Sequence, residues 1–227
     1  MGAISFSLDE SLIAFLAQTL PPCVFVETGT FKGDSLALAS RYFPECHSVE
    51  YSPQYFATAL LRFQGRTGIH LQPGPSPEFL RGLQAQLAGR PALFWLDAHW
   101  CQADNTAGAD SQSPLLAELA AMHPFHLESI LLIDDARLYL APPPAPHRLS
   151  DWPDFSEVVQ SLLRLSASHR IMVLNDVIIF YPKHIHEPLR RFAHTQGVDW
   201  LHLANQARDQ ASRKARARRW KRWLNPF

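Results

Sequence analysis

Short apolar runs alternate with amphipathic segments over most of the chain. Five runs have the composition of buried strands, and they cover residues 23–26, 47–50, 69–71, 92–96 and 129–133. The intervening and preceding segments carry apolar residues at helical spacing, over residues 8–20, 34–39, 52–63, 76–88 and 114–122. Near-continuous apolar strands separated by helices are typical of a parallel sheet that is covered on both faces.

The last third of the chain predicts a different ending for the sheet. The expected elements are a proline-rich connector at 142–146, a helix at 151–165, strands at 170–174 and 177–181, and a peripheral helix at 187–204. Asn175 and Asp176 separate the two strands, and such a short polar pair favours a hairpin. We therefore expect an α/β fold, a Rossmann-like three-layer sandwich whose mostly parallel seven-stranded sheet ends in an antiparallel hairpin.

Composition narrows the class of protein. A chain of 227 residues with 47% hydrophobic residues has enough material for one globular domain with a full core. No apolar run reaches the roughly 18 residues that a membrane span needs, and the N-terminal segment carries no basic leader. The three cysteines have no disulfide-framework spacing. A cytoplasmic protein with reduced thiols is the expectation.

The zero net charge conceals a strong asymmetry. Residues 205–227 contain eight Lys and Arg residues and a single acid, Asp209, which leaves 13 basic and 20 acidic residues in the rest of the chain. We therefore divide the chain into an acidic domain, 1–204, and a basic C-terminal helix or tail, 205–227.

Several partners are compatible with the basic tail. Its bases alternate with Trp220, Trp223 and Phe227, a pattern that suits the surface of an anionic membrane. Phosphates of a nucleic acid or the acidic body of its own or another subunit, in a homo-oligomer, are further candidates. A solvated extension is the remaining interpretation. Nucleic acid is the less favoured partner because the body is acidic.

Carboxylates end most of the predicted parallel strands. They are Glu27, Glu50, Asp97, Asp134 and Asp135. In doubly wound sheets, ligands bind outside the carboxyl ends of the strands. So much negative charge at one edge indicates a cationic ligand, a metal ion, or both.

The turn after the first strand identifies the class of cofactor. Its sequence runs from Glu27 through Thr28, Gly29 and Thr30 to Gly33, and glycine lets the backbone approach a ligand closely. Nicotinamide sites usually carry three glycines that support a pyrophosphate on a helix N-terminus. An acid is a poor neighbour for pyrophosphate and a good one for an ammonium group. The turn therefore favours S-adenosylmethionine, which carries an ammonium and a sulfonium.

Glu50 strengthens this interpretation. It ends the second strand, where an acid can accept hydrogen bonds from both ribose hydroxyls of a nucleoside cofactor. An oxidoreductase with the same sheet is a more distant alternative.

Three motifs resemble those of a known family, the class I S-adenosylmethionine-dependent methyltransferases. The motifs are Phe25-Val26-Glu27-Thr28-Gly29-Thr30-Phe31-Lys32-Gly33-Asp34-Ser35, Phe94-Trp95-Leu96-Asp97-Ala98-His99-Trp100 and Ile130-Leu131-Leu132-Ile133-Asp134-Asp135-Ala136-Arg137. The variant is similar to that of the macrocin O-methyltransferase-like group, and Asp151-Trp152-Pro153 also fits it. The resemblance covers roughly residues 20–181.

The resemblance implies a cofactor site and a metal site. The residues implied at the cofactor are Glu27, Thr28, Gly29, Thr30, Gly33, Glu50, Ser76 and Asp97, with the methionine moiety at the first turn, the ribose at Glu50 and the adenine near Ser76. Asp97, Asp134 and Asp135 match the metal ligands of the metal-dependent members, and three carboxylates suit Mg²⁺. The chain departs from the family's pattern in two places. It lacks the middle glycine of the commoner Gly-x-Gly-x-Gly turn, and Asp97-Ala98-His99 replaces the Asp-Gly-Asp of many macrocin-type members.

Catalysis requires that an acceptor hydroxyl lose its proton, through a base or a metal that lowers its pKa. His99 and Asp97 are the candidate catalytic residues, with His99 as general base because its ordinary pKa is near neutral. We expect an enzyme that methylates a hydroxyl of a small molecule or glycan. A non-catalytic binding protein with this fold and an RNA methyltransferase that grips its substrate with the basic tail are the alternatives.

Overall fold

A computed structural model describes residues 8–20, 24–87, 89–101 and 111–224. The described residues form one seven-stranded sheet in the order β3-β2-β1-β4-β5-β7-β6. Its strands are β1 (Val24–Thr28), β2 (Cys46–Glu50), β3 (Ile69–Pro73), β4 (Ala92–Leu96), β5 (Ile130–Ile133), β6 (His169–Leu174) and β7 (Val177–Pro182). Strands β1 to β5 run parallel, while β7 pairs antiparallel with both β5 and β6.

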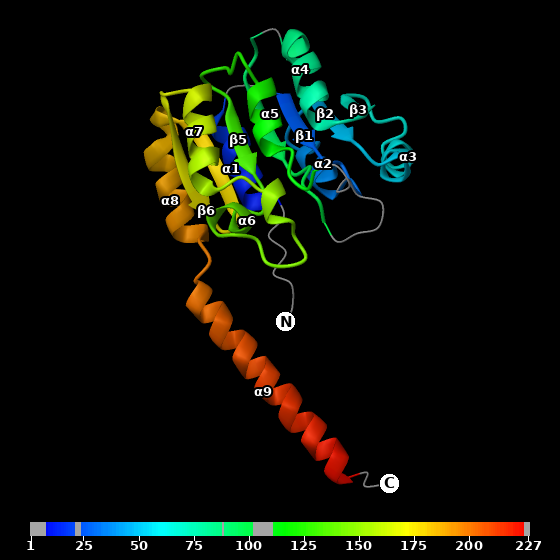
Figure 1. Cartoon of the computed structure of the whole chain (residues 1–227), viewed down its shortest axis with the longest axis vertical. Helices are drawn as coiled ribbons and strands as arrows, with labels where there is room; N and C mark the ends of the chain where they lie inside the picture. The colour runs from blue at the N-terminus through cyan, green and yellow to red at the C-terminus, as the bar shows by residue number, and fades with distance from the viewer. Residues whose placement is uncertain (1–7, 21–23, 88, 102–110, 225–227) are drawn as a thin grey trace.

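Helices cover both faces of the sheet (Figure 1). One face packs against α4 (Ser76–Leu87), α5 (Leu115–Ala121), α6 (Arg137–Leu140) and α7 (Phe155–Leu165). The other packs against α1 (Glu10–Thr19), α2 (Asp34–Ala39), α3 (Pro53–Arg62) and α8 (His186–Gln196). Two short 3-10 turns, η1 (Leu149–Asp151) and η2 (Lys183–Ile185), and the long helix α9 (Trp200–Leu224) complete the described chain. The sheet is therefore the central layer of a three-layer sandwich.

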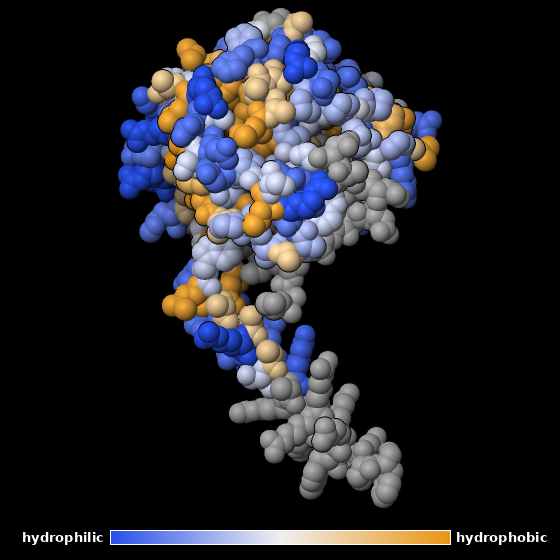
Figure 2. Space-filling view, viewed as in Figure 1, coloured by the Kyte–Doolittle hydropathy of each residue, from blue (hydrophilic) through white to orange (hydrophobic). Residues whose placement is uncertain are grey.

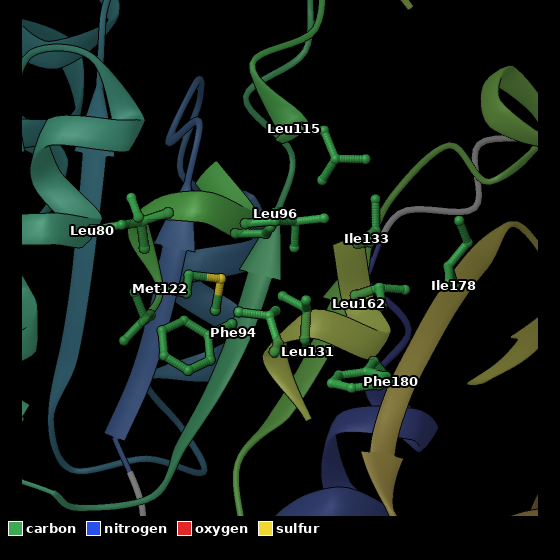
Figure 3. Packing of buried hydrophobic residues seen from close by; sticks show 14 of the residues in the cluster. Leu80, Phe94, Leu96, Leu115, Met122, Leu131, Ile133, Leu162, Ile178 and Phe180 are labelled. Atoms are coloured by element: carbon green, nitrogen blue, oxygen red, sulfur yellow. The ribbon is translucent and has the colours of Figure 1, made fainter. Parts of the chain in front are cut away.

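Strand residues alternate between two hydrophobic cores. In β1, Phe25 faces the core under α1 and α2, whereas Val26 faces the core under α4 and α5. Figure 3 shows the second core, where Phe94 and Leu96 of β4 pack with Leu115 at the start of α5. Because both faces are buried, apolar side chains are needed at almost every strand position, which produces the continuous apolar runs of the sequence.

The structure confirms the sandwich, the parallel strands and the terminal hairpin. Two parts of the helical structure differ from the prediction. Helix α6 was missed because it is only four residues long. The single helix expected at 187–204 is interrupted after Gln196, where Gly197 leaves the helical conformation. Of the three cysteines expected to be reduced, Cys46 is a buried free thiol, Cys101 is exposed, and Cys23 lies outside the described residues.

Helix α9 extends away from the sandwich (Figure 1). It begins at Trp200, inside the range expected to belong to the domain. Trp200 and Leu201 are more than half exposed, and Figure 2 shows hydrophobic residues beside hydrophilic ones at this end of the helix. In the described parts of the chain, no helix has both the length and the apolar character that crossing a membrane demands.

We expect that ending the chain after Val198 leaves the sandwich intact. The described α9 side chains up to residue 214 are exposed, except for half-buried Leu203, so little apolar area is lost from the core. The thermal midpoint, measured by circular dichroism, should change by less than about 3 °C. A substantially larger drop would mean that α9 packs on the domain in solution.

Candidate functional site

The first turn presses its backbone against the end of β4. Gly29 has a positive φ of 84°, and a Cβ placed there would lie 2.3 Å from the carbonyl oxygen of Asp97. Gly33 also has a positive φ, and a Cβ there would meet the ring of Phe63 at 2.7 Å. Both glycines are therefore required by close approach as well as by backbone conformation.

Phe31 occupies the position of the missing middle glycine. Its φ is 47°, so the residue keeps a left-handed backbone that glycine adopts more easily. Its N–H donates to Glu50 Oε2 at 2.7 Å, and its ring packs on Tyr55 with centroids 4.4 Å apart. These contacts hold the turn in shape without the glycine.

Glu50 ties the turn to the end of β2. Its other oxygen, Oε1, accepts from the N–H of Ser52 at 2.8 Å. The residue is 8% exposed, and each carboxylate oxygen has a second lone pair to offer. Glu50 is thus fixed in position and still able to accept hydrogen bonds from a ligand.

Glu27 is buried beneath the turn. Its carboxylate accepts hydrogen bonds from the hydroxyl of Ser35 and from that of Ser48, the latter at 2.6 Å. Burial raises the pKa of Glu27 to about 8, although the two serine hydroxyls oppose the rise. Since both oxygens are used internally and the residue is 0% exposed, Glu27 supports the turn from below.

His99 bridges two of the strand-end aspartates. Its Nε2 donates to Asp135 Oδ2 at 2.8 Å, and its Nδ1 lies 3.4 Å from Asp97 Oδ1. Burial alone would lower the pKa of His99, but the hydrogen bond to Asp135 and the charge of Asp97 raise it to about 9. At neutral pH the ring is therefore an imidazolium, whereas the sequence interpretation assumed a near-neutral pKa and a base.

The aspartates themselves differ in protonation. Burial is the main cause that raises the pKa of Asp97 to about 7 and that of Asp134 to about 8. For Asp135, burial acts in the same direction, but hydrogen bonds from His99 and Arg137 outweigh it and lower the pKa. Asp135 is thus the ionised partner of the two cations, His99 and Arg137, whereas the pKa of Asp97 lies near neutral pH.

These side chains do not fit the expected Mg²⁺ site. One carboxylate oxygen of Asp135 pairs with His99 and the other pairs with Arg137, which also pairs with Asp176. Asp134 Oδ1 accepts from the backbone N–H of Asp135 at 2.8 Å. Within the described residues, no group of three or more His, Cys, Asp or Glu side chains is arranged to hold a metal ion. The His99 ring lies between Asp97 and Asp135, two of the three residues that the resemblance implies as metal ligands.

A group of aromatic side chains lies beside His99. Trp152 lies with its ring centroid 5.8 Å from that of His99 and 5.4 Å from that of Tyr139. His147 packs edge-on against both Trp152 and Trp100. Trp100 follows β4, Tyr139 belongs to α6, and His147 and Trp152 lie between α6 and α7, so together these rings form an aromatic wall beside His99.

Most of the residues expected at a site do meet at one edge of the sheet. Glu27, Thr28, Gly29, Thr30, Gly33, Glu50, Asp97, Asp134 and Asp135 lie at or just beyond the carboxyl ends of β1, β2, β4 and β5. Ser76 begins α4 and is buried. The parallel register of these strands brings the residues together.

Sequence reasoning missed the buried acid Glu118. It shares the buried face of α5 with Leu115 and Leu119. The signal was available, because spacings of three and four place Glu118 on the apolar face of that helix. A lone acid on such a face is a candidate functional residue.

No protein-family model and no curated protein matches the sequence. Solved structures do match the fold. An O-methyltransferase from Bacillus cereus, in complex with SAH, is 14% identical with a TM-score of 0.51, covering 80% of this chain and 84% of that one. A candidate caffeoyl-CoA O-methyltransferase from Staphylococcus aureus is 12% identical with a TM-score of 0.55, covering 79% and 85%. A candidate O-methyltransferase from Klebsiella pneumoniae is 16% identical with a TM-score of 0.52, covering 80% and 83%. The chain therefore has the Rossmann-like fold of these methyltransferase structures.

We expect Glu27→Gln to stabilise the protein at alkaline pH. The folded-state pKa of Glu27 is raised from 4.5 to about 8, so ionising this carboxyl destabilises the folded protein as pH rises through that range. The variant should melt at least about 4 °C above the parent near pH 9, and the difference should shrink toward pH 5. Scanning calorimetry across pH measures this.

Glu78→Gln is the matched control, because Glu78 is an exposed acid on α4. Its melting curve should follow that of the parent at every pH. A Glu27→Gln difference that stays constant with pH would show that Glu27 is ionised throughout.

Proposed function

We propose that this protein is an S-adenosylmethionine-dependent methyltransferase that acts on a hydroxyl of a small molecule or glycan. One observation carries the proposal. The Gly29 turn is pressed onto the end of β4 while Glu50 is tethered to that turn and keeps lone pairs to offer. This is a rigid receptor for a nucleoside beside an edge of the sheet that is rich in carboxylates.

Separate groups of residues would bind the ribose, the methionine moiety and the adenine of the cofactor. Glu50 would accept from the ribose hydroxyls, the Thr28–Thr30 backbone would hold the methionine moiety, and the start of α4 at Ser76 would lie near the adenine. The acidic surroundings suit a ligand that carries a sulfonium and an ammonium. Nothing in this arrangement requires Mg²⁺, since His99 and Arg137 already neutralise Asp135.

The reaction would be an in-line displacement. The acceptor oxygen forms a bond to the methyl carbon as the carbon–sulfur bond breaks. The electron pair of the broken bond goes to the sulfur, which becomes a neutral thioether. The proton of the hydroxyl must go to a base. Asp97 is suited to receive it, because its pKa is raised to about 7 and an effective base has a pKa near the working pH. His99, as the adjacent cation, would orient Asp97 and stabilise its charge.

The aromatic wall suggests the shape of the acceptor. Half-buried Trp100 and His147 offer their rings near His99, and both His147 and His99 lie against the buried ring of Trp152. Planar aromatic rings and the apolar faces of sugars both pack on such surfaces. We therefore propose a ring-bearing alcohol or phenol as the acceptor.

Isothermal titration calorimetry tests the cofactor. We expect S-adenosylhomocysteine and S-adenosylmethionine to bind with micromolar affinity, and Glu50→Ala to weaken both at least about tenfold through the lost ribose hydrogen bonds. Millimolar Mg²⁺ should leave the affinities unchanged. If the parent protein binds neither ligand, the methyltransferase proposal is wrong and the fold serves another purpose.

A panel of phenols, catechols, hydroxylated sugars, amines and a short RNA tests the acceptor. Methyl transfer, followed by mass spectrometry, should occur on hydroxyl compounds, and Asp97→Asn should slow it by about 10²-fold or more, as expected for loss of a general base. Methylation of amines or RNA only would exclude the hydroxyl acceptor. Cofactor binding without any transfer would favour the non-catalytic alternative.

A further inference from the structure

The buried carboxylate of Glu118 approaches the site from below. Helix α5 packs on the sheet with Leu115 and Met122 directed toward the core (Figure 3), and Glu118 lies on the same side of the helix between them. The residue is 2% exposed. Its nearest polar surroundings are the hydroxyls of Thr28 and Ser76, two residues already expected at the cofactor, and beyond them the His99 cation.

Glu118 is incompletely satisfied there. Among the described residues, its Oε1 has no hydrogen-bond partner, and neither does the Oγ1 of Thr28. The hydroxyl of Ser52, just after Glu50, is a third buried polar atom without a partner. Buried polar atoms are almost always paired in folded proteins, so the unpaired Oε1 of Glu118 indicates that a polar ligand completes its surroundings.

The missing ligand should be positively charged on balance. Glu118 lies near Asp97, whose pKa it helps to raise after burial and Asp135. The nearby imidazolium of His99 is already shared between Asp97 and Asp135. The described residues therefore offer no full counter-charge to the ionised form of Glu118, and burial makes that form costly until a cation binds beside it. Burial also raises the pKa of Glu118, against the effect of Ser76, Thr28 and His99.

We propose that Glu118 is a cofactor-binding residue that favours the methyl donor over its product by facing the sulfonium charge. The inference rests on the proposed function. S-adenosylmethionine has a net positive charge of one, whereas S-adenosylhomocysteine is neutral, because transfer of the methyl group leaves a thioether. In a buried, low-dielectric site a bound cation favours the ionised form of Glu118 and is attracted by it, so the first binds more strongly than the second. Glu118 thus promotes exchange of spent cofactor for fresh donor.

The test compares the two ligands on matched variants by isothermal titration calorimetry. Glu118→Gln removes the charge and keeps the shape, and Glu78→Gln makes the same change at an exposed site on α4. We expect Glu118→Gln to weaken S-adenosylmethionine by about tenfold and to change S-adenosylhomocysteine by less than about threefold. Glu78→Gln should alter neither affinity.

Each other outcome has a distinct meaning. Equal loss for both ligands would make Glu118 a plain hydrogen-bond acceptor and overturn the charge preference. Unchanged affinities would make it a structural residue and also overturn the proposal, while the proposed function stands. Absence of binding to the parent protein would overturn both. Glu118→Asp, which keeps the charge, should retain the preference for S-adenosylmethionine and serves as the test if Glu118→Gln does not fold.

Discussion

Burial of several carboxylates at one edge of a parallel sheet is the constraint on which the site depends. Glu27, Glu50 and Glu118 are each less than 9% exposed, and Asp134 is buried beside them. Charged groups removed from water must find hydrogen bonds, counter-ions or a proton. The details of this site follow from how each carboxyl meets that requirement.

The carboxyls at this edge meet the requirement in different ways, which assign them different roles. Glu27 is satisfied by Ser35 and Ser48 and supports the turn. Glu50 uses backbone N–H groups and keeps acceptor capacity. Asp135 is neutralised by His99 and Arg137, while burial raises the pKa of Asp97 to about 7. Among the described residues, the Oε1 of Glu118 has no hydrogen-bond partner, which is why Glu118 indicates a ligand.

The same requirement is met in part by cations that the chain supplies beside its strand-end aspartates. A histidine two residues after Asp97 and an arginine two residues after Asp135 supply positive charge from the protein itself. The mixed sheet and its two cores do not depend on these ion pairs, since they are built from apolar strand residues on both faces. Fold similarity therefore persists to the solved methyltransferase structures at 12–16% identity.

The sequence alone determined the sandwich, the parallel strands, the terminal hairpin and the edge where the carboxylates meet, because periodicity and strand ends are local properties of the chain. It did not determine the break at Gly197 or the short helix α6, which involve too few residues to give a periodic signal. Only the tertiary structure decided the chemistry of the site. The pairing of His99 with Asp135, across 36 residues of sequence, makes the ring a cation, and the packing of α5 brings Glu118 under Thr28. Charge state and unsatisfied hydrogen bonding depend on neighbours in space, and the spacing of residues along the chain does not reveal those neighbours.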